Sequence, residues 1–267
     1  YLDFEDVSAA WGRPGQFNLR IGRMWIPFGE EYLLRGPVAN PLISHSLSDL
    51  WGVDEGIEIY GRLGPAQYVF AVQNGGVSRL RDFNGDKSVT GRVSWQPARW
   101  LRVSGSAMRT GEIASVADNL TELWFGNAFF RSLGPTARTG TFWANLYQID
   151  ATARWAAGHV VVSLGRAKYD DSDTIDDNSR HFRFGHIEAV QTITGGLYAA
   201  ARYSAIRVPD GYPIAGWGTM GAYFFRPGVL TEDLRRTSVG LGYRFGPPLV
   251  LKFEYCWEQG RLATGVR

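Results

Sequence analysis

The stretch 88–108 reads SVTGRVSW, QPAR and WLRVSGSAM, which are two alternating segments joined by a tiny turn. Val93 and Trp95 lie on one face of the first segment, and Arg92 lies on the other face. The second segment alternates in the same way and carries Arg102 on its polar face. Because successive side chains of a strand point to opposite faces, this period of two predicts β-strands with one apolar and one polar face.

The length of these segments favours a membrane barrel over a soluble β-sandwich. Strands of soluble proteins usually run for about five or six residues, whereas the alternating segments here approach the roughly ten residues that a strand needs to cross a membrane. Arginine recurs on the polar face, which suits a water-filled lumen. We therefore expect an all-β chain that forms one domain over 1–267, a transmembrane antiparallel up-and-down β-barrel.

The composition excludes several other classes of protein. No run of eighteen apolar residues occurs, so a membrane-spanning helix is excluded. The formal net charge of +2 gives no bulk electrostatic attraction to nucleic acid. The single cysteine, Cys256, excludes an internal disulfide and a multi-cysteine metal site.

The alternating segments pair into hairpins along the whole chain. Twelve strands are expected, at 2–12, 17–29, 56–63, 67–76, 87–96, 100–110, 140–156, 159–169, 180–193, 196–208, 237–246 and 249–260. Six connections are short and rich in Gly and Pro, at 13–16, 64–66, 96–99, 156–159, 194–196 and 246–248. The alternate connections are long, at 30–55, 77–86, 111–139, 170–179 and 209–236. Short turns on the periplasmic side and long loops on the extracellular side are typical of outer-membrane barrels.

Aromatic residues on the apolar register predict the two borders of the membrane. One set lies beside the short turns, namely Trp11, Phe17, Trp95, Trp155 and Phe245. A second set lies eight to twelve residues from the nearest turn, namely Trp25, Trp143 and Trp257. At about 3.3 Å per residue and a tilt of about 45°, this separation corresponds to roughly 19–28 Å, close to the expected apolar band.

The strand count leaves two interpretations of closure. With this sidedness the first strand descends from the outside and the twelfth returns to it, whereas both termini of a complete barrel normally lie in the periplasm. Either the chain closes as a twelve-stranded barrel with unusual ends, or flanking strands are missing. We favour missing strands, and we expect a leader to precede Tyr1.

The stretch 3–32 resembles the phosphate-selective porin O/P family. Members show an acidic descending strand, a short turn and an ascending strand that ends in G-[RQ]-x-x-x-P-F-G, which here reads GRMWIPFG over 22–29. The block 48–77, with its terminal N-G-G, resembles the following hairpin of the family, and KSVTGRVSWQP resembles the next strand. The resemblance implies a sixteen-stranded barrel, a homotrimer in the outer membrane of a Gram-negative-type bacterium, and a loop 30–55 that inserts into the lumen as a constriction.

The polar register predicts which side chains line the pore. The basic members are Arg20, Arg62, Arg92, Arg102, Arg154, Arg202, Arg244 and Lys252. The other charged or titratable members are Glu58, Asp150, His186, Glu188, Glu254 and Glu258. Because rings of positive side chains favour anions, the surplus of positive charge predicts a weak anion preference and not a dedicated phosphate ladder.

The position of five of these arginines predicts a basic collar at the periplasmic mouth. They all lie near short turns and are Arg20, Arg62, Arg102, Arg154 and Arg244. The alternative is that the arginines pair with carboxylates of the wall and only brace it.

The expected constriction loop carries mixed charge, which favours general passage of small solutes over specific phosphate binding. Its candidate residues are Glu30, Glu31, Arg35, His45 and Asp49. We interpret His45 as a hydrogen-bonded loop residue and not as a ligand. We expect no metal site and no cofactor.

Two acidic stretches are interpreted as solvated loops. DDSDTIDDN (170–178) and DFNGD (82–86) lack the spacing of a calcium-binding loop, and divalent bridging to lipopolysaccharide phosphates is the alternative. No HExxH, P-loop, GxSxG or CxxC motif occurs, so we do not expect an enzyme.

The sequence therefore predicts an outer-membrane porin, a passive diffusion channel for small hydrophilic solutes. The expected partners are outer-membrane lipid and lipopolysaccharide, two further copies of the chain, and small anionic or neutral solutes, but no nucleic acid. The alternative function is a structural barrel that anchors or sheathes a partner in an outer-membrane complex.

Overall fold

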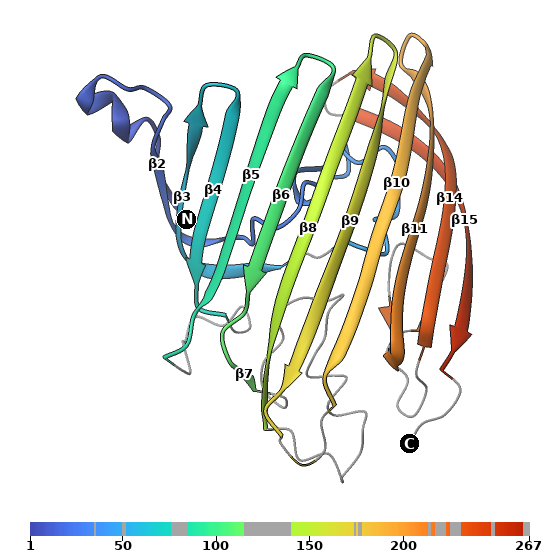
Figure 1. Cartoon of the computed structure of the whole chain (residues 1–267). Helices are drawn as coiled ribbons and strands as arrows, with labels where there is room; N and C mark the ends of the chain where they lie inside the picture. Colours follow the sequence, from blue (N-terminus) through green and yellow to red (C-terminus); the bar gives the residue numbers. More distant parts are fainter. Residues whose placement is uncertain are drawn as a thin grey trace.

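The computed structural model describes residues 1–34, 36–49, 52–75, 85–114, 140–173, 175, 178–212, 215–216, 223–224, 231–246 and 249–263. Its main sheet is antiparallel throughout and follows chain order, which confirms the predicted up-and-down architecture (Figure 1). Twelve strands make up this order: β1 (Leu2–Phe4), β2 (Asn18–Trp25), β3 (Val53–Leu63), β4 (Ala66–Gln73), β5 (Ser88–Ala98), β6 (Leu101–Arg109), β8 (Thr141–Trp155), β9 (Gly158–Asp171), β10 (Arg180–Thr194), β11 (Leu197–Tyr212), β14 (Thr231–Gly246) and β15 (Leu249–Leu262).

The remaining elements are short. β7 (Ile113–Ala114) pairs with β8, and β12 (Ala215–Gly216) pairs with β13 (Tyr223–Phe224) as a separate ribbon. Two 3₁₀ turns, η1 (Val7–Trp11) and η2 (Glu31–Leu34), flank β2. Among the described residues no helix is long and apolar enough to span a membrane. Within the same residues β1 pairs only with β2, and β15 pairs only with β14.

The first predicted strand, 2–12, is wrong beyond Phe4. The chain turns at Asp6, whose φ is +57°, and continues as η1. The buried Ser8 hydroxyl accepts hydrogen bonds from the backbone N–H groups of Gln16 (3.1 Å) and Phe17 (2.9 Å). These side-chain bonds replace a strand ladder here, as local serine bonds commonly do. Trp11 therefore lies on η1 and not on the apolar face of a strand.

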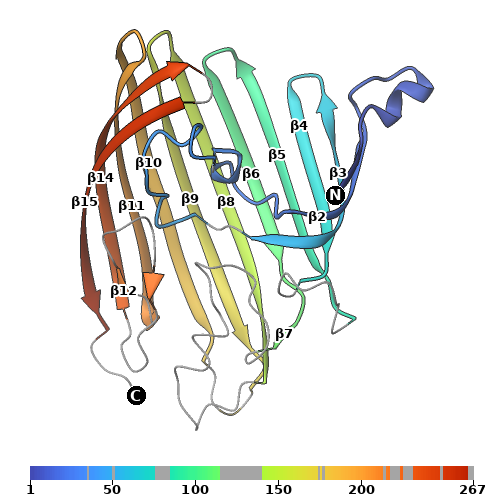
Figure 2. The ribbon, with the colours of Figure 1, turned by 180° about the vertical axis from the view of Figure 1, so that it is seen from behind.

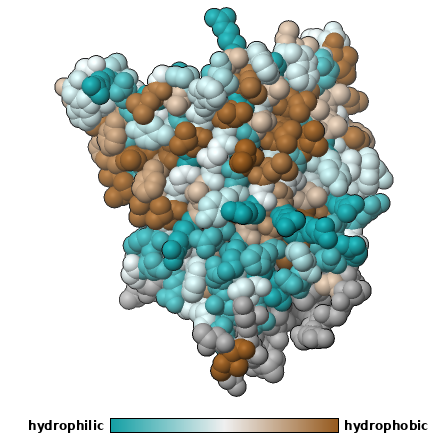
Figure 3. All heavy atoms as spheres, viewed as in Figure 1, coloured by the Kyte–Doolittle hydropathy of each residue, from teal (hydrophilic) through white to brown (hydrophobic). Residues whose placement is uncertain are grey.

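The outer face of the sheet is apolar over a broad band. In the opening unit Val93 and Trp95 are exposed and Arg92 is buried, as the alternation predicts. Ile149 on β8 is 69% exposed and Phe253 on β15 is 71% exposed. The space-filling view shows this band across the half of the sheet that carries the short turns (Figure 3). A soluble monomer rarely exposes such a large contiguous apolar surface, whereas a barrel in lipid requires one.

The inner face is not uniformly polar, although the alternation in the sequence predicts a polar inner face. Fourteen buried apolar residues form one cluster there, including Phe142, Phe182 and Ile206 from the wall. Phe28 and Leu47, which lie between β2 and β3, belong to the same cluster. The segment between these two strands is therefore packed against the wall by apolar burial.

A charge in the middle of the apolar band is expected to destabilise the protein. Phe253→Arg places a guanidinium where lipid contacts the strand, and the expected loss is about 2–4 kcal/mol of unfolding free energy. The matched control is Gln259→Arg on the same face of β15, beyond Trp257, where we expect at most about 1 kcal/mol. Urea unfolding in lipid vesicles measures both changes, and equal losses would contradict the assignment of this face to lipid.

Candidate functional site

The segment 26–52 leaves β2, crosses the concave face of the sheet and enters β3 (Figure 2). Near its start, this segment contains Pro27-Phe28-Gly29, the last three residues of the GRMWIPFG motif. Gly29 has a φ of +71°, and its N–H donates to the Ser106 hydroxyl at 3.1 Å. A Cβ at this position would lie 2.5 Å from Nε2 of Gln148. Glycine is therefore favoured by the left-handed backbone, and any larger residue would also displace the end of the Gln148 side chain.

The first attachment joins the loop to β5 and β6. Glu30 accepts hydrogen bonds from Arg92 at 2.9 Å and from Arg102 at 3.1 Å. Arg92 also donates to the Gly29 carbonyl at 3.3 Å and to the Tyr32 hydroxyl at 3.0 Å. One loop carboxylate is thus held between two wall arginines, and charge-assisted bonds of this kind are the strong ones.

The second attachment is centred on Glu254 of β15. Its carboxylate accepts from the backbone N–H groups of Ile43 (2.6 Å) and Ser44 (2.7 Å) and from the Ser44 hydroxyl (2.5 Å). Lys252 on the same strand donates to the carbonyls of Asn40 (2.5 Å) and Leu42 (2.9 Å). The backbone polar groups of this part of the loop therefore find partners on the wall, as buried groups must.

Arg202 of β11 completes the second attachment. It is buried, forms an ion pair with Glu188, and donates to the Ser44 carbonyl at 2.8 Å and to Oδ1 of Asn40 at 3.0 Å. Nearby, the Tyr198 hydroxyl donates to the Pro41 carbonyl at 2.9 Å. Four strands, β10, β11, β14 and β15, contribute polar contacts to this half of the loop.

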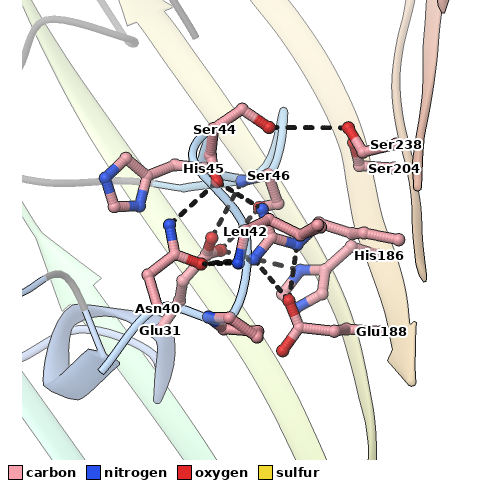
Figure 4. A network of polar contacts seen from close by, with 12 residues as sticks. Glu31, Asn40, Leu42, Ser44, His45, Ser46, His186, Glu188, Ser204 and Ser238 are labelled. Atoms are coloured by element: carbon pink, nitrogen blue, oxygen red, sulfur yellow. Dashed lines mark hydrogen bonds and ion pairs between the residues drawn. The ribbon is translucent and has the colours of Figure 1, made fainter. Parts of the chain in front are cut away.

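A third group of contacts surrounds Glu31 (Figure 4). Its carboxylate accepts from the Ser46 N–H at 2.9 Å and from the Ser46 hydroxyl at 2.5 Å, and it lies 3.7 Å from Nδ1 of His186. Burial raises the pKa of Glu31, but His186, Arg202 and the Ser46 donors outweigh burial and lower the pKa to about 2. Glu31 is therefore ionised at neutral pH. His186 also shares a hydrogen bond of 2.8 Å with the Ser48 hydroxyl.

A cavity of about 200 Å³, lined by both apolar and charged side chains, lies between the loop and the wall. Its acidic lining is Glu30, Glu31, Asp150 and Glu188. Its basic and histidine lining is Arg102, Arg154, Arg202, Arg244, His45, His159 and His186. A second hollow of about 340 Å³ lies at the short-turn rim and is lined by Arg62, Arg99 and Arg102, with no carboxylate among its described lining.

The predicted pore residues fall into three groups. Arg92, Arg102, Arg202, Arg244 and Lys252 hold the loop, with Arg244 donating to the Val38 carbonyl at 2.8 Å.

Arg20 pairs instead with Asp3 (2.8 Å) and Glu58 (2.6 Å), so it braces β1 to β3. Arg62 and Arg154 are exposed, and within the described part of the chain no hydrogen bond or ion pair engages either guanidinium. Of the five arginines of the expected collar, Arg20, Arg102 and Arg244 therefore have partners on the wall or the loop, and the collar stays a prediction that rests on Arg62 and Arg154. Arg35 lies outside the described residues.

The predicted loop residues lie where the loop meets the wall or the cavity. Glu30, Glu31 and His45 line the cavity, while Asp49 is buried and lies 3.6 Å from Nδ1 of His45. Glu31, His45 and Asp49 bring potential metal-ligating atoms within 4.8 Å of one another. Both oxygens of Glu31 already accept hydrogen bonds from Ser46, so the loop's own network accounts for this grouping.

Sequence reasoning missed several residues of the attachment. Ser44, Ser46 and Ser48 alternate in the stretch ISHSLS, a pattern that could have indicated a polar edge on the loop. Arg236 is buried on the inner face, pairs with Glu258 and donates to the His45 carbonyl at 3.2 Å. It was missed because the predicted strand began one residue later, although the period of two runs unbroken from Arg244 back to Arg236.

The fold is similar to solved structures of outer-membrane proteins. OmpT, an outer membrane protein of Vibrio cholerae in its trimer form, gives a TM-score of 0.61 at 11% identity over 93% of this chain and 68% of that chain. The outer membrane channel DcaP of Acinetobacter baumannii gives 0.55 at 12% identity over 92% of this chain and 66% of that chain. No protein-family model matches the sequence, and no curated protein matches it. The chain therefore has the fold of outer-membrane β-barrel proteins, in agreement with the expected location in the outer membrane.

Proposed function

We propose that the chain forms a passive diffusion channel for small hydrophilic solutes in the outer membrane, with the loop 30–55 as its constriction. The observation that carries this proposal is the attachment of the loop to both sides of the concave face, by Arg92 and Arg102 on one side and by Arg202 and Glu254 on the other. A loop held at both sides narrows the lumen without closing it, because the cavity between loop and wall remains.

The weak anion preference in this proposal comes from the rim and not from the loop. The carboxylates of Glu30 and Glu188 are neutralised by ion pairs with wall arginines. Arg62 and Arg154, which are exposed near the short turns, have no carboxylate partner among the described residues. Fixed positive charge at a pore mouth raises the local concentration of anions and lowers that of cations.

The proposal also includes the finer features implied by the sequence: a sixteen-stranded barrel, a homotrimer and kinship with the phosphate-selective porin O/P family. Support comes from the GRMWIPFG motif, whose last residues direct the chain into the interior. The trimer form of OmpT and the channel DcaP are the structural neighbours that favour a trimeric channel. The proposal assigns the chain no catalytic activity.

Removing one collar charge is expected to shift ion selectivity. Arg154→Gln should move the reversal potential in a planar bilayer toward cations and leave stability unchanged, because no described residue forms a hydrogen bond or ion pair with this side chain. The matched control, Arg23→Gln, removes a charge that faces Glu55 on the outer register and should leave selectivity unchanged. Clear cation selectivity of the wild type would contradict the proposed preference, and the absence of any conductance would favour the structural barrel that anchors a partner.

Releasing the loop from β15 is expected to widen the channel. Glu254→Ala removes the acceptor for three hydrogen bonds from the loop, each worth about 1.5–3 kcal/mol when one partner is charged. We expect larger and noisier single-channel currents from a correctly folded barrel. Glu232→Gln, which loses an exposed ion pair with Arg261, is the control. Unchanged currents in Glu254→Ala would show that the loop does not limit conductance.

A further inference from the structure

A cluster of exposed basic side chains lies on the outer face, on the long-loop side of the apolar band. Its six members occupy the outward register of β6, β9, β10, β11 and β14: Arg109, Arg166, Lys168, Arg183, Arg207 and Arg235. We call them the outer basic cluster. A hydrophilic belt crosses the outer surface directly beyond the apolar band at this level (Figure 3).

The cluster places like charges side by side. Arg183 lies directly opposite Arg166 on one neighbouring strand and opposite Arg207 on the other. Neighbouring strands are about 4.8 Å apart, and like charges directly opposite one another destabilise a sheet. The row of three arginines therefore carries a cost in the free protein that an anionic ligand would remove.

Neighbouring carboxylates neutralise only part of the positive charge of the cluster. Lys168 pairs with Asp170, and Arg235 pairs at 2.7 Å with Asp233, which lies opposite Arg207 in the ladder. In the described part of the chain no hydrogen bond or ion pair engages the guanidinium of Arg109, Arg183 or Arg207. The cluster thus has a surplus of unmatched positive charge.

The charge belongs to one membrane border only. At the opposite ends of the same strands the last side chains of the outward register are Leu101, Val160, Ile193, Leu197 and Phe245, all of them apolar. General solubility or crowding of charge would not produce such a difference between the two borders. A ligand present in only one leaflet explains it.

An apolar groove of about 1070 Å³ leads to the cluster. It crosses the outer face from β4 to β10, because on the outward register Gly91 and Gly105 have no side chain and Ala107 has only a methyl group. Arg166 and Arg183 line its far part, and the guanidinium of Arg166 lies 5.0 Å from the centre of the Tyr147 ring. A groove of this kind accommodates a hydrocarbon chain with its anionic end at the arginines.

We propose that the outer basic cluster and the groove bind lipopolysaccharide, with its phosphate groups on the arginines and an acyl chain in the groove. Guanidinium groups match phosphate oxygens in a forked geometry, and three adjacent arginines suit a headgroup with more than one phosphate. This site faces lipid on the outside of the barrel and does not depend on the channel proposed above.

The test uses the full chain refolded in non-ionic detergent and titrated with diphosphoryl lipid A, dephosphorylated lipid A or inorganic phosphate. Native mass spectrometry measures the bound lipid. The variant is Arg166→Gln/Arg183→Gln/Arg207→Gln, and the control of equal charge loss is Arg13→Gln/Arg23→Gln/Arg99→Gln. Heat-modifiability on electrophoresis checks that the triple variant and the control both fold. If the triple variant does not fold, the single variant Arg183→Gln is used in its place.

We expect wild type and control to bind diphosphoryl lipid A with equal affinity and the triple variant to bind at least about tenfold more weakly, a change of about 1.4 kcal/mol. Dephosphorylated lipid A should bind all three weakly. The proposal would be overturned if the triple variant bound diphosphoryl lipid A as tightly as the wild type. It would also be overturned if inorganic phosphate bound as tightly as lipid A, or if the wild type associated with itself and excluded the lipid. The conductance of the triple variant in phospholipid bilayers should equal that of the wild type. Lipid binding is measured separately from conductance, so the lipid-binding result stands even if the channel proposal fails.

Discussion

The structure depends on one constraint: every second side chain of the sheet faces lipid, so charged groups must lie on the inner face or at the membrane borders. A buried charge on the inner face is costly unless it is paired or hydrogen-bonded. The loop 26–52 supplies those partners, since Glu30 meets Arg92 and Arg102, and the backbone near Ser44 meets Arg202 and Glu254. Wall and loop therefore stabilise each other, and the loop's position across the lumen follows from the charge on the wall.

Apolar contacts also hold the loop against the wall, in addition to the polar contacts. Phe28 and Leu47 pack into the cluster formed by Phe142, Phe182 and Ile206 on the wall. The inner face thus has a large apolar region and a second region in which charged and apolar side chains surround the cavity. This division explains how the loop can be firmly attached while a cavity with charged lining remains beside it.

The period of two was enough to predict the twelve strands and their faces, because register determines the environment of each side chain. It failed at 2–12, where the side chain of Ser8 bonds to the backbone and replaces a ladder. It also could not predict the apolar part of the inner face, because the partners of those residues come from a loop distant in sequence. The period of two also could not predict which carboxylates the arginines pair with. The structure shows that Arg20 pairs with Asp3 and that Arg92 pairs with Glu30 of the loop.

The most direct test of the account is the position of the loop in the membrane-embedded protein. Oγ of Ser44 lies 3.9 Å from Sγ of Cys256 on β15, so Ser44→Cys places two thiols within reach of each other. The account predicts that mild oxidation of the folded variant in lipid vesicles forms a disulfide between positions 44 and 256, identified by peptide mapping without reduction. A free thiol at position 44 that instead reacts with a bulky maleimide would contradict the attachment of the loop to the wall.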